Sequence, residues 1–250
     1  MEETFEVNEQ ARTEAFSGVW DRQLNKVFAD VAGYYDRANV IASLGMLGLW
    51  LKKFVATIDV RPGDKMLDVC AGTNVMGIAL LKKEPTLTVQ AMDRSPDMQR
   101  VGGERAAKHG FVIQSEIGDV HKLPFPDDHF DVVTLQYASR HLGIRQVSSE
   151  ILRVLKPGGV FYHCDMLRPA NPLVEKAYYG FLWYPLSFTS WLFDSKEDAL
   201  ACRKYFIDSL KMFYSSEELK DLLEDVGFTD VGYQQVFAGM VAFHKAVRPA

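Results

Sequence analysis

The sequence predicts an α/β domain with a mostly parallel sheet of seven strands and helices on both faces. Short apolar segments alternate with helical segments through the middle of the chain, a pattern typical of βαβ units. Turn sequences such as Arg61–Asp64 and Lys156–Gly159 separate these segments. The expected strands are residues 65–70, 88–92, 112–117, 130–137, 160–165, 230–237 and 240–246, and the expected helices between them are 75–83, 96–109 and 147–155.

We expect one domain with four parts. Residues 1–59 should form N-terminal helices, one of them over 47–58, and residues 60–169 the alternating core. Residues 170–212 form an aromatic helical insert, and 213–250 a helix followed by two strands. The N-terminal helical spacing of three and four residues is carried by Phe28, Val31, Ala32, Tyr35 and Ala38. Ser215–Glu218 predicts the start of the last helix, Gly227 its end and Gly239 a turn between the final strands.

The insert contains the segment 173–193, which is rich in aromatic residues. It also carries Glu175, Lys176 and Pro185, so it is too polar for a membrane span and predicts a buried or interfacial helix pair. Three roles stay open for it: a wall for an apolar substrate, contact with a membrane interface, or structural cover that includes a dimer contact. The aromatic and apolar residues concerned are Tyr178, Tyr179, Phe181, Leu182, Trp183, Tyr184, Phe188, Trp191 and Phe193.

Composition excludes several classes of protein. Apolar residues make up 48% of the 250 residues, which is enough for a sizeable core. The net charge is −5 and no polybasic cluster occurs, so we expect no nucleic-acid partner. Cys70, Cys164 and Cys202 form neither a disulfide framework nor paired metal-ligand spacing. With no secretory signal at the start, these features predict a cytoplasmic protein without a metal site.

The loop Asp68–Asn74 is the first candidate site. An expected strand delivers Asp68, small residues follow, and a helix begins, so a ligand can approach the backbone closely. Asp93 ends the next strand, where a carboxylate can accept hydrogen bonds from ribose hydroxyls. The Gly-x-Gly-x-x-Gly run of dinucleotide sites is absent. A tight turn without any ligand remains the alternative.

Further segments make the pattern more specific. Gly118-Asp119 ends the third strand, where the carboxylate is placed to accept from an adenine amino group. Leu123–Asp127 leads into the fourth strand, and Leu155–Gly159 precedes the fifth. In this order and spacing, the segments closely resemble class I S-adenosylmethionine-dependent methyltransferases, whose fold is Rossmann-like.

The flanks resemble one family within that class, the ubiquinone/menaquinone biosynthesis C-methyltransferases. The similarity begins with residues 27–39, continues through 43–45, 50–53 and 195–205, and ends with 238–244. It covers about residues 25–248. It implies S-adenosylmethionine as cofactor and a ring carbon of a polyprenyl hydroquinone, such as demethylmenaquinol, as acceptor.

The resemblance also assigns residues. The implied cofactor contacts are Thr73, Asp93, Asp119, Val120 and Gln136; the loop residues Asp68, Ala71 and Gly72, and Arg94 beside Asp93, are further cofactor candidates. The resemblance implies a substrate-side role for Tyr35 and Arg140, and the neighbouring His141 is a further catalytic candidate on chemical grounds. Arg140 would stabilise a phenolate, and His141 would act as general base because its ordinary pKa is near 6.5.

Each role has a structural alternative. Arg140 would otherwise bridge a loop to a carboxylate, His141 would lie in a solvent-facing turn, and Tyr35 would pack in a core. His163 is expected as a packed core histidine rather than a site residue, and Asp165 is a weaker candidate for orienting the ring.

Three segments depart from the family pattern. The loop usually reads Ala-Gly-Gly-Thr-Gly, and here it is Cys70–Asn74; Asn74 is expected to keep the turn because Asn tolerates the left-handed region. Residues 137–141 and 163–166 also differ from Phe-Gly-Leu-Arg-Asn and Leu-Glu-Phe-Ser. These changes lie where the acceptor should bind. Methylation of oxygen or nitrogen, an NAD-type oxidoreductase and a non-catalytic binding protein therefore stay open as alternatives.

Overall fold

The computed structural model describes residues 2–22, 35–43, 45–192 and 197–250. Their sheet has seven strands in the order β3-β2-β1-β4-β5-β7-β6. The strands are β1 (Lys65–Val69), β2 (Thr88–Asp93), β3 (Gln114–Ile117), β4 (Phe130–Gln136), β5 (Leu155–Met166), β6 (Thr229–Val236) and β7 (Val241–Val247). The first five pair in parallel, whereas β7 is antiparallel to β5 and β6 to β7. The predicted fold class is confirmed.

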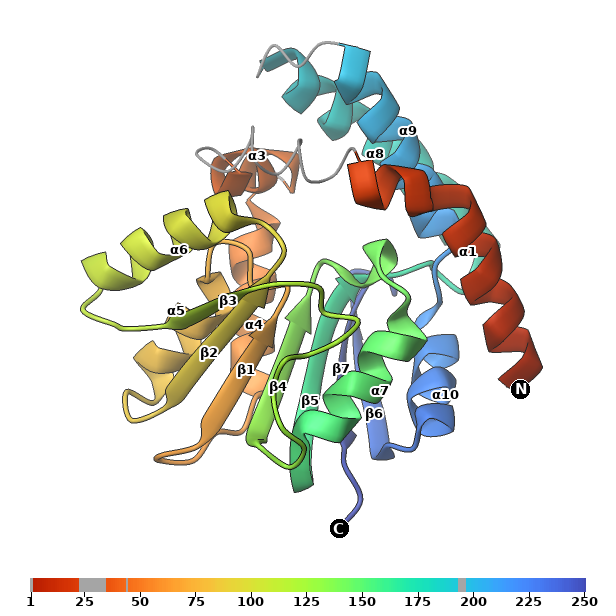
Figure 1. The fold of residues 1–250 in the computed structure, drawn as a ribbon. Coiled ribbons are helices and arrows are strands. Elements are labelled where there is room, and N and C mark those ends of the chain that lie inside the picture. Colours follow the sequence, from red (N-terminus) through yellow and green to blue (C-terminus); the bar gives the residue numbers. More distant parts are fainter. Residues whose placement is uncertain (1, 23–34, 44, 193–196) are drawn as a thin grey trace.

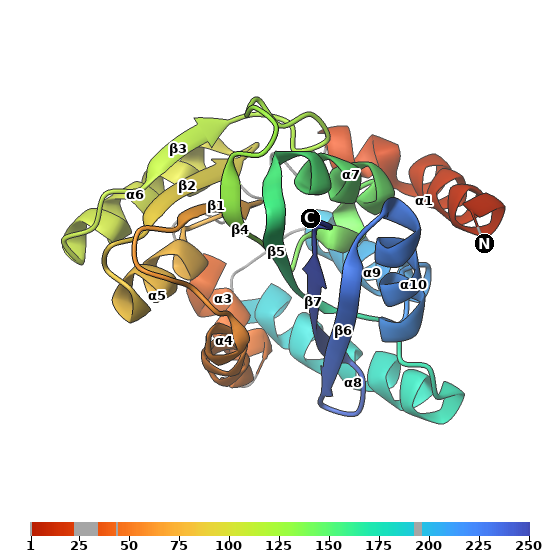
Figure 2. The same ribbon diagram turned by 90° about the horizontal axis from the view of Figure 1, so that it is seen from below.

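Helices cover both faces of this sheet (Figures 1 and 2). They are α1 (Glu2–Arg22), α3 (Tyr35–Ala42), α4 (Met46–Thr57), α5 (Val75–Lys83), α6 (Pro96–Lys108), α7 (Ile144–Val154), α8 (Pro172–Leu192), α9 (Glu197–Lys211) and α10 (Ser216–Val226), with a short 3-10 turn at Ser139–His141. The predicted N-terminal helix positions Phe28, Val31 and Ala32 lie outside the described residues.

Two apolar cores form because successive strand residues point to opposite faces of the sheet. On β1, Met66 faces the cluster that includes Phe54 of α4 and Leu80 of α5. Its neighbour Leu67 faces the other cluster, which includes Val147 of α7 and residues of α10. Since both faces of the central sheet are covered, strands β1 and β4 are largely buried and read as near-continuous apolar runs, whereas all four residues of the edge strand β3 are exposed.

The last helix confirms its sequence signals. Ser215 caps α10 by accepting a hydrogen bond from the Glu218 backbone, and the Glu218 carboxylate accepts from the Ser215 backbone at 2.7 Å. Gly227 ends the helix with a φ of 116°, a left-handed conformation that glycine adopts without strain.

Two local predictions were wrong. The predicted turn at Lys156–Gly159 lies within β5, where the register against β4 shifts between Phe130 and Val132. Gly158 has a φ of 76°, so the segment is an irregularity of the strand rather than a separate turn. A helix pair was predicted over 173–193, but the described part of this segment, up to Leu192, is a single helix, α8, that continues through Pro185; Phe193 lies outside the described residues.

The insert lies beyond the carboxyl ends of the parallel strands. Helix α8 packs against α9 and α3, and all three stand over this edge of the sheet in Figure 1. Packing of Tyr178 and Leu182 against Leu210 of α9 contributes to keeping α8 continuous despite the proline, whose local penalty is about 3 kcal/mol. The described residues contain no helix with the length and hydrophobicity needed to cross a bilayer.

Candidate active site

The loop between β1 and α5 passes through two left-handed residues that are not glycine. Cys70 has a φ of 55° and Asn74 a φ of 57°. The expectation that Asn74 keeps the turn is confirmed. Gly102 of α6 lies against this loop so closely that a Cβ atom would meet Asn74 at 2.8 Å and the Thr73 backbone at 2.9 Å. Close packing of α6 therefore fixes the loop from behind.

Asp93, at the end of β2, connects this loop to the start of α6. One carboxylate oxygen accepts from the Gly72 backbone N–H at 2.8 Å, and the other from the Ser95 backbone N–H at 2.9 Å. Burial raises the pKa of Asp93, while these two hydrogen bonds and Arg94 oppose the rise. The carboxylate is thereby oriented while each oxygen keeps a further lone pair for a ligand hydroxyl.

A cavity opens at the carboxyl ends of β1, β2 and β4. It contains about 760 Å³ of space, including the part open to solvent. Six of the predicted cofactor residues line it: Gly72, Asp93, Arg94, Asp119, Val120 and Gln136. The other lining residues are Cys70, Met98, Gly118, His121, Tyr137, Ala138, His141 and Leu142.

The Asp119 side of the cavity is held by a histidine. The Nδ1 atom of His121 lies 2.6 Å from an Asp119 oxygen, and its Nε2 accepts from the Gly143 backbone N–H at 3.0 Å. Burial acts to raise the pKa of Asp119, but the hydrogen bonds from His121 outweigh it and the pKa is lowered. The Asp119 side chain is 75% exposed and ionised, ready to accept from an amino group.

Three predicted cofactor residues do not line the cavity. Asp68 is fully buried, and one oxygen accepts from the Thr134 hydroxyl at 2.7 Å. Thr73 is buried too, and its hydroxyl bonds to Asp36 of α3 at 3.1 Å and to Arg105 of α6 at 3.1 Å. Ala71 is buried in the loop. The buried side chains of Asp68 and Thr73 therefore support the loop from behind.

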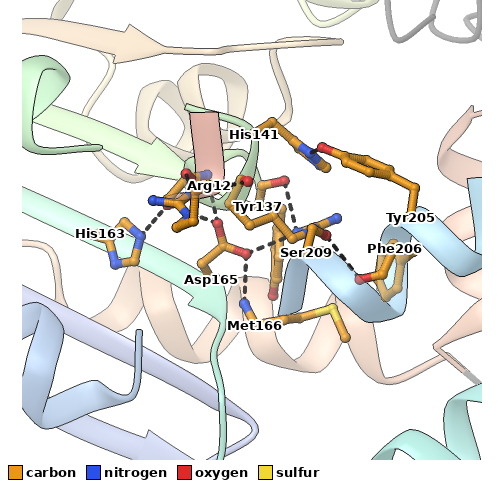
Figure 3. Close-up of polar contacts among 11 residues, drawn as sticks. Arg12, Tyr137, His141, His163, Asp165, Met166, Tyr205, Phe206 and Ser209 are labelled. Carbon is orange, nitrogen blue, oxygen red and sulfur yellow. Dashed lines mark hydrogen bonds and ion pairs between the residues drawn. The ribbon is translucent and has the colours of Figure 1, made fainter. Parts of the chain in front are cut away.

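Arg140 and His141 lie next to the cavity, on the 3-10 turn after β4. His141 lines the cavity, stacks on Tyr205 at 5.4 Å and shares a hydrogen bond with the Tyr205 hydroxyl through Nδ1 (Figure 3). Burial, with the positive charges of Arg140 and Arg12, lowers the pKa of His141 well below 6.5. His141 is therefore a neutral imidazole held between two elements rather than a solvent-facing turn residue.

Arg140 is buried and pairs with Asp165 of β5 at 3.1 Å. Its guanidinium also lies 4.5 Å from the centre of the Phe206 ring, and its Nε has no hydrogen-bond partner among the described residues. The bridge to a carboxylate is thus present, and an unused donor remains beside it. Tyr35 begins α3, but its side chain lies outside the described residues.

Some lining residues were not foreseen, although their positions follow a rule. Gly118, Tyr137 and Ala138 directly follow strands β3 and β4, and the sequence placed their segments at the ligand edge without giving these three residues a role. Met98, His121 and Leu142 come from helix and loop positions that carry no such signal. Among the described residues, no group of His, Cys, Asp and Glu side chains is arranged to hold a metal ion.

This geometry fits S-adenosylmethionine better than a dinucleotide. Two oriented carboxylates face a cavity at the strand ends, one suited to ribose hydroxyls and one to an adenine amino group. The loop lacks the glycine pattern that brings a pyrophosphate onto a helix N-terminus. A cationic sulfonium without phosphates matches a cavity that has acidic groups on its wall. The fold and this site define a class I S-adenosylmethionine-dependent methyltransferase.

Comparisons with known proteins give the family. The model of the ubiE/COQ5 methyltransferase family matches residues 17–248, so the chain belongs to that family. The chain is 34% identical to the ubiquinone/menaquinone biosynthesis C-methyltransferase UbiE of Ectopseudomonas mendocina, over 90% of this chain and 88% of the relative. It is 35% identical to the UbiE of Pseudomonas fluorescens, with the same coverage of 90% and 88%.

Solved structures agree on the fold. A methyltransferase from Thermotoga maritima, described as a possible histamine N-methyltransferase, superposes with a TM-score of 0.62 and 17% identity, covering 90% of this chain and 99% of that one. At this identity the likeness concerns the fold alone. The chain is therefore an S-adenosylmethionine-dependent methyltransferase of the ubiE/COQ5 family.

Proposed function

We propose that this enzyme methylates a ring carbon of a quinol-like aromatic, such as demethylmenaquinol. The observation that carries the proposal is Arg140, a buried guanidinium with an unused Nε donor, one residue from His141 on the cavity wall. A ring carbon becomes nucleophilic when a neighbouring hydroxyl is ionised, and a fixed cation beside the oxygen stabilises that state. The quinone-biosynthesis relatives support an aromatic acceptor of this type.

The residues divide the work as follows. Asp93 and Asp119 are proposed to bind the ribose and adenine groups, with Asp68, Ala71, Gly72, Thr73, Arg94, Val120 and Gln136 shaping or lining their site. When bound, S-adenosylmethionine supplies an electrophilic methyl group. The acceptor hydroxyl loses its proton to solvent, and Arg140 holds the negative charge left on the oxygen. The rigid wall aligns the ring with the methyl group, and the methylated ring carbon then releases its own proton to solvent, which restores the aromatic ring.

His141 is a weaker proton acceptor than its ordinary pKa suggests. The burial and neighbouring cations that keep it neutral also disfavour its protonated form. We therefore assign it a hydrogen bond to the acceptor and give Arg140 the larger share of the stabilisation. Tyr35, at the start of α3, is proposed to contact the ring.

The insert offers apolar cover on the acceptor side. Tyr178, Leu182 and Leu210 form a buried cluster, against which Phe206 and Met166 pack. The Tyr178 hydroxyl is buried without a hydrogen-bond partner among the described residues. It lies close enough to Arg140 for the positive charge of the guanidinium to act against the rise in the Tyr178 pKa that burial causes. This wall is suited to an aromatic head group that carries oxygen atoms and an apolar tail.

The outer side of α8 supports peripheral contact with a membrane, from which a prenylated acceptor would enter. Leu173, Trp183 and Tyr184 are 79%, 52% and 74% exposed. Amphipathic aromatic side chains favour the interface between lipid and water. Vesicle flotation tests this: wild type should float, and Trp183→Ser with Tyr184→Ser should float less. Sedimentation without vesicles separates this contact from a dimer through the same side of α8. A cytoplasmic enzyme that keeps this side for the membrane should sediment as a monomer, and a dimer should sediment with twice that mass.

The function is tested with methyl-deuterated S-adenosylmethionine and a reduced demethylquinone that carries a short prenyl tail. Mass spectrometry should show one deuterated methyl group per acceptor, and the already methylated quinol should gain none. Glu104→Ala, an exposed member of a surface ion pair, is the control and should keep full turnover. Absence of labelled quinol, while the cofactor binds, would remove this acceptor class.

A further inference from the structure

A buried chain of polar groups runs from Asp165 at the end of β5 to the backbone carbonyl of Ser216 on α10. Asp165 Oδ2 lies 2.8 Å from the Ser139 hydroxyl, and that hydroxyl lies 2.5 Å from His163 Nε2. His163 Nδ1 lies 3.3 Å from His244 Nδ1, whose Nε2 is 3.0 Å from the Ser216 carbonyl. Figure 3 shows the part of this chain that runs from Asp165 to His163. The three side chains between the ends are buried to 99% or more.

The four contacts of this chain need four hydrogens. The Ser139 hydroxyl supplies one, and His163 and His244 supply one each when neutral, which gives three. The Ser216 carbonyl only accepts, so His244 must donate to it through Nε2 and its Nδ1 must accept from His163 Nδ1. His163 Nε2 must then accept from the Ser139 hydroxyl, whose oxygen is left to accept from Asp165. With an ionised Asp165 and two neutral imidazoles, one contact would therefore join two lone pairs. The geometry requires one additional proton.

The additional proton has two possible positions, an imidazole or the Asp165 carboxyl. Both imidazoles are buried, and desolvation is the largest cause that lowers the pKa of each to about 3. Burial raises the pKa of Asp165, while Arg140 and the backbone N–H groups of Ser139 and Met166 oppose that rise; the Ser139 hydroxyl opposes it as well only when its hydrogen points to Asp165 instead of to His163. The other groups that face Asp165 are the backbone N–H groups of Ser139 and Met166 and the side chains of Tyr137, Cys164 and Tyr178, none of which is a cation.

We infer that Asp165 holds this proton as a neutral carboxylic acid, so that Arg140 lacks an ionised partner and binds the ionised hydroxyl of an aromatic acceptor. The second half of this inference rests on the proposed function. A guanidinium stays cationic even when buried, so its charge must be met by another group. The cation–π contact with the Phe206 ring stabilises the Arg140 charge only weakly. Ser139, His163 and His244 are then positioning residues that act on Arg140 through the protonation of Asp165.

Two spectroscopic measurements test the proton count without turnover. In 15N-histidine-labelled protein at pH 7, His163 should carry its hydrogen on Nδ1 and His244 on Nε2, both neutral. Infrared spectra should show a protonated carboxyl band that Asp165→Asn removes. In Ser139→Ala the two remaining contacts have two hydrogens, so Asp165 should ionise and the band should disappear. His129→Leu, outside the chain, should leave it unchanged. An imidazolium at either histidine, or an ionised Asp165 in the wild type, would overturn the assignment.

The effect on Arg140 is tested with 4-nitrophenol, whose phenolate absorbs at a different wavelength from the phenol. Bound beside S-adenosylhomocysteine in the wild-type enzyme, the dye should have a pKa lowered by about 1 to 3, as expected for a nearby unpaired cation. In Ser139→Ala the ionised Asp165 should remove most of this lowering. An equal pKa in both proteins, or no binding of the dye, refutes selection of the anion by Arg140. Loss of quinol methylation with these results intact would refute only the proposed function.

Discussion

Replacing Asp68 with asparagine is expected to stabilise the protein more at about pH 8 than at about pH 4. Asp68 is fully buried on β1, where one oxygen accepts from Thr134 at 2.7 Å and the other has no hydrogen-bond partner among the described residues. Burial is the largest cause that raises the pKa of this carboxyl from 3.8 to about 7. An asparagine keeps the acceptor for Thr134 and carries no charge at any of these pH values.

The magnitude follows from the shift in the Asp68 pKa. In the folded protein the carboxyl holds its proton up to about pH 7, whereas in the unfolded chain it loses the proton near 3.8. Its contribution to stability is therefore fully present below pH 3.8 and is lost as the pH rises through 7. One pKa unit corresponds to about 1.4 kcal/mol, so the loss reaches up to about 4 kcal/mol. Asp68→Asn has no carboxyl to ionise, so its free energy of unfolding should not fall by this amount as the pH rises.

Urea unfolding followed by circular dichroism at several pH values measures this difference directly. The free energy of unfolding of Asp68→Asn, relative to wild type, should rise steadily between about pH 4 and pH 8. Asp131→Asn is the control with the opposite sign, because the ion pair with Lys156 outweighs burial and lowers the pKa of Asp131. A difference between Asp68→Asn and wild type that does not change with pH would refute the reasoning.

Four further outcomes are expected. Asp93→Ala should weaken S-adenosylmethionine binding in calorimetry by about tenfold to a hundredfold, because a charged acceptor is lost, while Glu104→Ala leaves it unchanged. Arg140→Ala should lower kcat by at least about a hundredfold in a turnover assay while cofactor affinity stays within about twofold; unchanged kcat would remove Arg140 from the mechanism. His121→Phe should weaken cofactor binding several-fold by freeing Asp119, and equal affinity would contradict its role. Ser215→Ala should destabilise the protein by about 1 kcal/mol in thermal unfolding, and an unchanged Tm would contradict the capping box.

The strands and the cofactor loop could be predicted from the sequence because their signals are local. Apolar runs, Asn74 in the left-handed region and the Ser215–Glu218 capping box each act within a few residues. The continuous helix α8 could not be predicted, because contacts with α9 and α3, far away in the sequence, act against the local preference of Pro185. At Lys156–Gly159 the turn prediction was wrong because the strand pairing that makes this segment part of β5 is also non-local.

The candidate site shows the same division. Asp93 and Asp119 were found because they end parallel strands, where ligands bind in such sheets. Asp68 and Thr73 belong to the same motif, but their side chains turn inward to Thr134 and to Asp36 and Arg105. A motif locates a backbone segment, and it does not determine which side of that segment each side chain takes.

The polar chain behind the cavity had no sequence signal at all. Ser139, His163 and His244 come from the turn after β4, from β5 and from β7, and only the sheet pairing brings them together. His163 was expected to be a packed core residue, and it is buried as expected, yet it is hydrogen-bonded on both ring nitrogens. Such a network depends on the three-dimensional register of distant strands.

The central claim is methyl transfer to carbon, and the position of a labelled methyl group tests it most directly. The enzyme would be incubated with S-adenosylmethionine carrying a 13C-methyl group and with a reduced demethylquinone, and the product examined by carbon NMR. We predict a single labelled methyl bonded to a ring carbon, in the wild type but not in Arg140→Ala. A labelled methyl on oxygen, or an unlabelled acceptor in the presence of bound cofactor, would contradict the account.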